Sequence, residues 1–218
     1  VERLRRGLYL VIPLEAGPER RWSAEAFVIA SALVPHGAVA YWSAIRHWNW
    51  TEQTPRAVFV QTSRRVAWQA KTVLGVLYRC TVVGPSRFFG VRTEYLGGRP
   101  FRVTDPEKTV LDALDHVELS GGFTVVQPAV RSASRDVNWK KMDDYIARFP
   151  NRAALKRLGF IIESGRMELP DREARLENWR ARISSGWAAL DPGGNRQAGR
   201  INRRWRIRVN VPGTAADG

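Results

Sequence analysis

Hydrophobic and polar positions follow one pattern in the first half of the chain and another in the second. Between residues 56 and 103, apolar residues come in short runs bounded by turn residues, which is typical of β-strands. These runs predict five strands, at residues 56–62, 71–74, 76–83, 91–95 and 99–103. Because the loops between them are short, we expect a mixed or antiparallel sheet, with antiparallel pairs in the majority.

The chain before these strands predicts a hairpin and then a helix. Glu2–Pro13 reads as two strands joined at Gly7, because a basic run and an apolar run flank a residue suited to tight turns. Trp22 and Ser23 are expected to open the helix, with Ser23 as its N-cap, and Pro35 to end it.

Residues 36–51, HGAVAYWSAIRHWNWT, are rich in tryptophan. Trp42, Ile45 and Trp48 recur at a spacing that places them on one side of a short helix, and Asn49 suits a left-handed helix end. A short helix this rich in tryptophan is not stable alone, so we interpret it as part of the hydrophobic core. The alternative is an aromatic platform on which nucleic-acid bases stack.

In the second half of the chain, apolar residues recur every three to four positions, which is typical of amphipathic helices. Thr104 and Glu107 form a capping box, with Pro106 in the first turn of the helix. The stretch at 123–133 is helical except for Pro128, so it is either kinked there or starts only at Gln127. Three more helices are predicted, with Asn138, Asn151 and Asp171 as caps.

The last segment alternates strictly. At residues 204–211, Trp205, Ile207, Val209 and Val211 occupy one face, and three arginines and Asn210 occupy the other, the pattern of a half-buried strand. Residues 212–218 are expected to be a disordered tail. Together, the strands and helices predict the α+β class.

The net charge of the chain limits the classes of binding partner. The 218 residues carry a net charge of +14, which favours polyanions such as nucleic acid or an anionic membrane surface. No apolar run is long enough to span a bilayer. Of the two polyanions, we expect nucleic acid and not a membrane to be the partner. The single cysteine, Cys80, excludes an internal disulfide; it predicts a buried, inert thiol and a cytoplasmic location.

Chemical motifs are few. His36, His47 and His116 have no cysteine or carboxylate at metal-ligand spacing, so neither a metal nor a cofactor is expected. Asp105 and Glu107 lie close to a lysine, as the acidic residues of restriction-type nucleases do, but the capping box already accounts for them. A metal-dependent nuclease, with Glu94 as a further acid, remains an alternative.

Three arginine groups are the candidate DNA-binding residues, since guanidinium groups pair bidentately with phosphate. A solvated surface, an edge strand protected against aggregation, or a domain for an acidic protein partner would also explain such groups. The groups are Arg3, Arg5 and Arg6 at the hairpin, Arg64 and Arg65 in a loop, and Arg204, Arg206 and Arg208 on the last strand.

The ordered motifs resemble the AbiEi-type antitoxins of type IV toxin–antitoxin systems across residues 1–211. They are ERLRRGLYLV, FVIASALVPHGAVAYWSAIRHWNWTEQTPRAVFV, RFFGV, FRVTDPEKTVLDALDH, ALKRLGFIIE and RWRIRVNV. The resemblance implies a non-catalytic protein with an N-terminal winged helix-turn-helix domain and a C-terminal α/β domain. It implies binding to double-stranded DNA at the promoter of its own operon, which the protein represses. It also implies that the protein counters a nucleotidyltransferase-type toxin without a stable complex.

The family's recognition helix has no counterpart in this chain, which also lacks an initiator methionine, so we expect a truncated form. The resemblance makes residues 1–14 the remnant of the wing, with Arg3, Arg5 and Arg6 as phosphate contacts. It makes residues 22–211 the antitoxin domain. Without the recognition helix, we expect weak DNA binding with little preference for the promoter.

Overall fold

The computed structural model describes residues 2–5, 7–11 and 25–211. By their contacts, the residues divide into two compact units. Val1–Ala44 and Thr54–Asp105 make up the first, which we call the N-terminal unit, and Ile45–Gln53 and Pro106–Gly218 make up the second, the C-terminal unit.

This division differs from the predicted one, in which residues 1–14 are a wing and residues 22–211 a single domain. The predicted tail at 212–218 lies outside the described residues. The predicted α+β class is confirmed, because the chain combines a six-stranded mixed sheet, a three-stranded sheet and seven α-helices within its described part. None of those helices is long and apolar enough to cross a bilayer.

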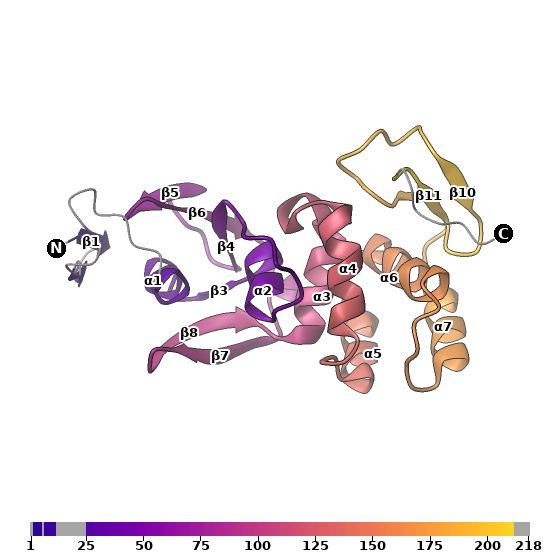
Figure 1. The fold of residues 1–218 in the computed structure, drawn as a ribbon, viewed down its shortest axis with the longest axis horizontal. Helices are drawn as coiled ribbons and strands as arrows, with labels where there is room; N and C mark the ends of the chain where they lie inside the picture. The colour runs from indigo at the N-terminus through magenta and orange to yellow at the C-terminus, as the bar shows by residue number, and fades with distance from the viewer. Residues whose placement is uncertain (1, 6, 12–24, 212–218) are drawn as a thin grey trace. The chain divides into compact units, whose positions relative to one another are not determined.

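The large sheet of the N-terminal unit has the order β5-β6-β4-β3-β8-β7 (Figure 1). Its strands are β3 (Gly37–Val39), β4 (Ala57–Thr62), β5 (Ala70–Val73), β6 (Val76–Val82), β7 (Val91–Leu96) and β8 (Arg99–Thr104). The predicted neighbouring strands 71–74 and 76–83, and 91–95 and 99–103, form hairpins, and Gly75, Gly97 and Gly98 have positive φ angles at the β5–β6 and β7–β8 connections.

The expected mixed sheet with mostly antiparallel pairs is confirmed; two pairs, β4–β6 and β3–β8, are parallel. Residues 63–75 lead from β4 to β6 and include β5, which pairs antiparallel with β6 at the edge of the sheet. The connection is therefore long enough to return the chain to the starting end of β4, as a parallel pair requires.

Helix α1 (Ala26–Leu33) packs against β3, β4 and β8 through Ile29, Ala30 and Leu33 (Figure 1). It ends before Pro35, as predicted, whereas Trp22 and Ser23 lie outside the described residues. The N-terminal hairpin is confirmed as β1 (Glu2–Arg5) paired antiparallel with β2 (Leu8–Leu10). Its turn contains Gly7 with φ +73°.

The tryptophan-rich stretch forms a helix, α2 (Tyr41–His47), that is shorter than its apolar pattern suggests. Trp48 lies beyond its end, so the predicted side of Trp42, Ile45 and Trp48 does not form; both tryptophans are half-buried. Trp50 is instead the buried tryptophan, at 5% exposure. The predicted left-handed residue is confirmed, because Asn49 has φ +58°.

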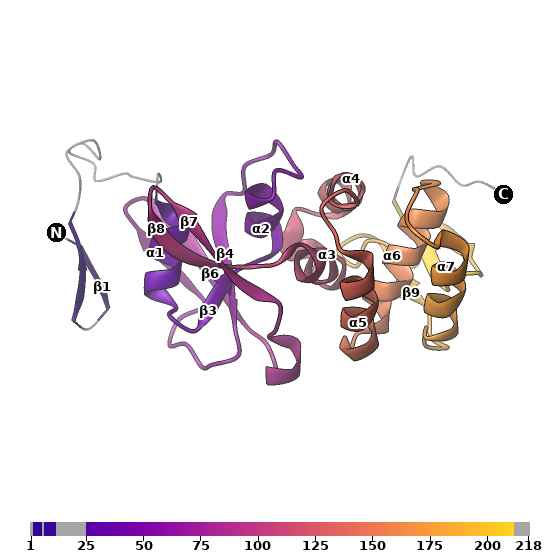
Figure 2. The same cartoon turned by 90° about the horizontal axis from the view of Figure 1, so that it is seen from below.

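The C-terminal unit is built around α3 (Pro106–Asp115), every residue of which is buried. Figure 2 shows α3 beside α4 (Phe123–Ala133), α5 (Trp139–Arg148) and α6 (Arg152–Ser164). The sequence predicts an apolar stripe on α3, but the helix is enclosed on all sides. Its buried Lys108 is compatible with this because it forms an ion pair with Asp112, one turn later.

Two predicted caps are confirmed. The Asn138 side chain accepts a hydrogen bond from the amide of Lys141 at 3.1 Å, and Asn151 accepts one from the amide of Ala153 at 3.0 Å. Asp171 does precede α7 (Arg172–Ala181), but its side chain makes no capping hydrogen bond. Its left-handed backbone, with φ +52°, replaces the extended conformation usual at an N-cap.

Helix α4 begins at Phe123 and continues through Pro128; it follows the 3-10 turn η3 (Val117–Ser120) and two glycines with positive φ, Gly121 and Gly122. The prediction that it could start at Gln127 is therefore wrong. Pro128 and Thr124, whose carbonyl loses a partner to the proline, are both exposed, so water can hydrogen-bond that carbonyl.

The chain ends in a small sheet of order β10-β11-β9, with β9 (Ala188–Ala189), β10 (Arg200–Asn202) and β11 (Ile207–Val209). The predicted strand at 204–211 is wrong in its first half, because residues 203–206 form a turn in which Arg206 has φ +52°. The alternation in burial still holds: Trp205, Ile207 and Val209 are buried.

Candidate anion-binding cleft

The residues considered for nuclease chemistry are engaged in structural contacts. Glu107 Oε1 accepts a hydrogen bond from the amide of Asn138 at 2.7 Å, and Glu107 Oε2 lies 2.8 Å from Lys141 Nζ. The Glu107 half of the predicted capping box is therefore wrong, since this carboxylate joins α3 to the start of α5. The further acid, Glu94, pairs with Arg92 at 2.6 Å.

Metal-binding residues do not converge in the described part of the chain, where no three histidine, cysteine or acidic side chains could hold an ion. His116 Nδ1 lies 3.0 Å from Glu118 Oε1, an exposed contact that lowers the pKa of Glu118. The prediction of a buried thiol is confirmed for Cys80, and burial raises its pKa to about 11.

The predicted DNA-binding arginines are divided between the two units. Arg3 and Arg5 belong to β1, but their side chains and the whole of Arg6 lie outside the described residues. Arg64 and Arg65 are exposed in the segment after β4. The third group, Arg204, Arg206 and Arg208, belongs to the C-terminal unit.

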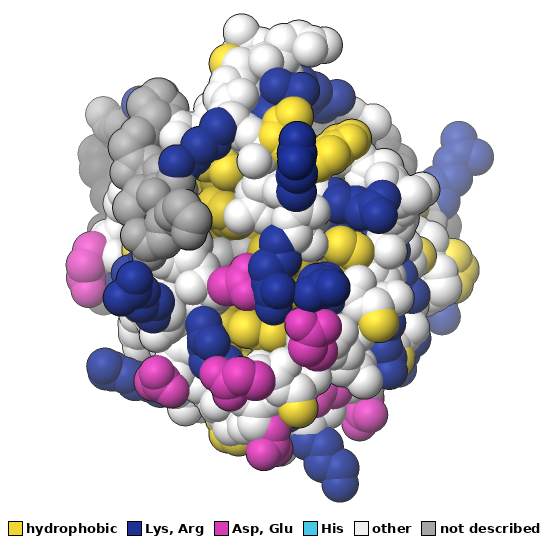
Figure 3. All heavy atoms as spheres, turned by 90° about the vertical axis from the view of Figure 1, so that its right-hand side faces the viewer, with side chains coloured by type: hydrophobic (Ala, Val, Ile, Leu, Met, Phe, Trp, Pro, Cys, Tyr) yellow, Lys and Arg dark blue, Asp and Glu magenta, His cyan; other side chains and the backbone are white. Residues whose placement is uncertain are grey.

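Two arginines of this third group, Arg204 and Arg206, share a cleft with Arg180 and Arg203. The cleft is open, has a volume of about 590 Å³ and is completed by Ala181 and Ile183. Arg208 is not among its lining residues; its Nη1 donates to the Gln197 carbonyl at 3.0 Å. Figure 3 shows this end of the C-terminal unit, where lysine and arginine side chains gather beside a few acidic ones.

The turn at 203–206 is positioned by Trp205, which has no exposed surface. Its indole Nε1 donates to Glu163 Oε2 at 2.7 Å, and its amide donates to Asn202 Oδ1 at 2.9 Å. The ring lies directly on Gly159 of α6, where an added Cβ would be 2.2 Å from a ring carbon. Because Trp205 points inward, the arginines on either side of it are held at the surface.

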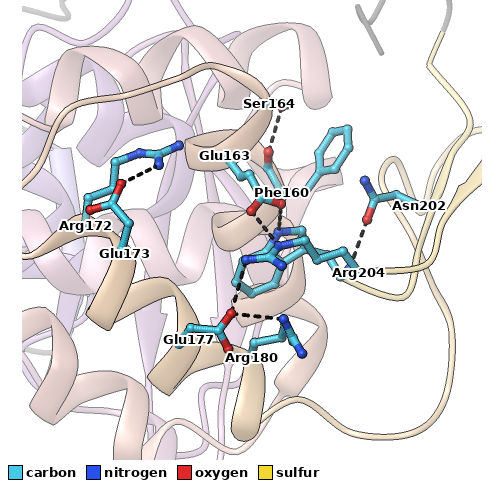
Figure 4. A network of polar contacts seen from close by, with 10 residues as sticks. Phe160, Glu163, Ser164, Arg172, Glu173, Glu177, Arg180, Asn202 and Arg204 are labelled. Carbon is cyan, nitrogen blue, oxygen red and sulfur yellow. Dashed lines mark hydrogen bonds and ion pairs between the residues drawn. The ribbon is translucent and has the colours of Figure 1, made fainter. Parts of the chain in front are cut away.

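Ion pairs with two glutamates, Glu163 and Glu177, hold Arg204 and Arg180 in position (Figure 4). Glu163 Oε1 lies 2.6 Å from Arg204 Nε, so this carboxylate joins Arg204 to the buried Trp205. Glu177 Oε1 lies 3.0 Å from Arg180 Nη1 and 3.4 Å from Arg204 Nη2. One oxygen therefore bridges the two guanidinium groups.

The cleft keeps an excess of positive charge after these pairs are formed. Arg206 Nη1 donates to the Ser185 carbonyl at 2.6 Å. Because a carbonyl is neutral, this contact does not neutralise the positive charge of Arg206. The Arg203 guanidinium makes no hydrogen bond or ion pair with any residue that the structure describes. Burial and, secondarily, the charge of Arg206 lower the pKa of Lys156, as expected in a positive field.

Arg180 and Arg203 are absent from the predicted site. Arg203 lies in a basic stretch, residues 192–216, that contains no acidic residue, but it precedes the alternating pattern that begins at Arg204. Arg180 lies in the last turn of α7 and reaches the cleft through tertiary packing, for which the sequence has no local signal.

No family model matches the chain, and no curated protein matches it. A similar solved structure is that of the Rv2827c protein from Mycobacterium tuberculosis, with a TM-score of 0.57 and 13% sequence identity. The similarity covers 82% of this chain and 64% of the other, so this chain spans somewhat less than two thirds of that protein. At this identity, the similarity establishes a shared fold.

Proposed function

We propose that the chain binds the phosphate backbone of double-stranded DNA through the arginine cleft of the C-terminal unit. The observation that carries the proposal is the convergence of Arg180, Arg203, Arg204 and Arg206 around one open cleft. Guanidinium groups form short, bidentate hydrogen bonds with phosphate oxygens, and the net charge of +14 attracts DNA over a longer range.

Within that proposal, the biological role is that of a type IV antitoxin which represses its own operon in the cytoplasm. The resemblance to AbiEi-type antitoxins supports this role, and the hairpin β1–β2 occupies the segment that corresponds to the family's wing. The protein would counter a nucleotidyltransferase-type toxin without forming a stable complex with it. Co-expression with the toxin encoded beside it should restore growth, and failure to do so would exclude the antitoxin role.

A double substitution of Arg203 and Arg206 by alanine tests the DNA-binding proposal. We expect affinity for a short duplex to fall about ten-fold at low salt, because each lost phosphate contact costs about 0.5–1.5 kcal/mol. Fluorescence anisotropy would compare a duplex carrying the operon's promoter with a shuffled duplex. The affinity for the two duplexes should fall by the same factor, since backbone contacts carry no sequence information.

Arg135→Ala is the matched control. Arg135 is exposed in the same unit, does not line the cleft, and its guanidinium makes no contact with described residues. The loss of DNA affinity per arginine removed should be smaller for Arg135→Ala than for the double variant of the cleft. Equal losses would reduce the proposal to a general effect of net charge. Binding to an acidic protein but not to DNA would favour the interaction-domain alternative.

A further inference from the structure

One carboxylate bridges two of the arginines that line the cleft, although its own residue, Glu177, is not among the lining residues. Glu177 Oε1 contacts both Arg180 and Arg204, on the side of Arg204 that Glu163 leaves open (Figure 4). A phosphate oxygen has the same hydrogen-bonding chemistry as this carboxylate oxygen, and a phosphate group offers more acceptor oxygens. Within the proposed function, ligand and Glu177 would therefore compete for the same guanidinium groups.

The two glutamates differ in how firmly they are held. The Glu163 side chain is 28% exposed and joined to the fully buried Trp205, so its movement would disturb the core. The Glu177 side chain is 58% exposed, and its partners Arg180 and Arg204 are each 42% exposed. Exposed ion pairs of this kind contribute little stability, so Glu177 can turn into solvent at low cost.

We propose that a phosphate group binds between Arg180, Arg203 and Arg204 by replacing the Glu177 carboxylate. Arg203, which has no internal partner among the described residues, would contribute its full hydrogen-bonding capacity to the phosphate. Glu163 keeps Arg204 in place throughout the exchange. This inference rests on the proposed function for the source of the phosphate, but the exchange itself concerns any phosphate ligand.

Glu177→Gln tests the exchange, because it removes the competing charge and preserves the shape of the side chain. We expect the variant to bind duplex DNA about three-fold more tightly than the unmodified chain, in line with the small free energies of exposed pairs. Its thermal stability should be nearly unchanged, as for most surface substitutions. The full chain of 218 residues would be used.

Glu173→Gln is the matched control on the same helix. It removes the same charge, but Glu173 is 86% exposed and pairs with Arg172, which does not line the cleft. Its affinity for DNA should therefore change less than that of Glu177→Gln. Equal gains for the two variants, or no gain for Glu177→Gln, would overturn the exchange.

Pyrophosphate separates the exchange from the proposed DNA binding. With pyrophosphate as the probe, Glu177→Gln should reach half of its thermal stabilisation at a concentration about three-fold lower than Glu173→Gln does. This result without any DNA binding would remove the proposed function and retain the exchange. Identical responses of the two variants to both probes would remove the exchange, even if the unmodified chain binds DNA.

Discussion

Replacement of Trp50 by alanine should lower the free energy of unfolding of the C-terminal unit by about 3–5 kcal/mol. Trp50 is 5% exposed, its Nε1 donates to Asp136 Oδ2 at 2.6 Å, and its ring lies 6.3 Å from that of Trp48. The substitution removes a large buried ring together with its hydrogen bond to Asp136, an exposed residue whose carboxylate can be solvated instead. Chemical denaturation followed by circular dichroism would measure the loss.

Trp48→Ala serves as the comparison within the same cluster. Trp48 is half-buried, and its Nε1 donates to Thr109 Oγ1 at 3.2 Å, so we expect a loss of only about 1–2 kcal/mol. A loss for Trp48→Ala as large as that for Trp50→Ala would contradict this ranking. A stable Trp48→Ala variant with strongly reduced DNA binding would support the base-stacking interpretation instead.

Arg157→Met should destabilise the C-terminal unit by about 3 kcal/mol, because buried acceptors would lose their charged donor. Arg157 is 4% exposed; its Nη1 donates to the Leu114 carbonyl at 2.7 Å and its Nε to the Ala189 carbonyl at 3.0 Å. Leu114 lies in the last turn of α3, where carbonyls lack partners within the helix and a positive charge is favourable.

The charge of Arg157 persists at neutral pH even though burial lowers its pKa to about 10. Arg157→Lys keeps a positive charge but cannot reproduce the two separated donors, so it should recover only part of the lost stability. At pH 7, the denaturation midpoint should be highest for the unmodified chain, lower for Arg157→Lys and lowest for Arg157→Met. A methionine variant as stable as the parent would show that these contacts contribute nothing to stability.

Local patterns account for the parts of the fold that could be predicted. The hairpins required only alternating residues and glycines such as Gly7, Gly97 and Gly98, and the helix starts at Asn138 and Asn151 required only a short polar side chain. Strands β3 and β9 have three and two residues, too few to form a pattern. Their pairing depends on partners far along the chain.

The cleft could be predicted only in part, because its geometry also depends on contacts between residues far apart in sequence. The arginines at 204 and 206 stand out in the sequence, but the turn that presents them depends on Trp205 packing on Gly159, 46 positions earlier. The pairing of Glu177 with Arg204 also joins positions far apart in sequence, 27 residues from one another. Alternation alone predicts a regular strand at these positions, whereas the tertiary contact with α6 produces a turn.

The salt dependence of duplex binding tests the role of the cleft most directly. Each phosphate neutralised by the protein adds about 0.9 to the slope of log affinity against log salt concentration. The unmodified chain should therefore show a steeper slope than Arg203→Ala/Arg206→Ala, by about 1–2 if each arginine contacts a phosphate. Parallel slopes for the two proteins would contradict the account, because the cleft would then make no phosphate contact on DNA.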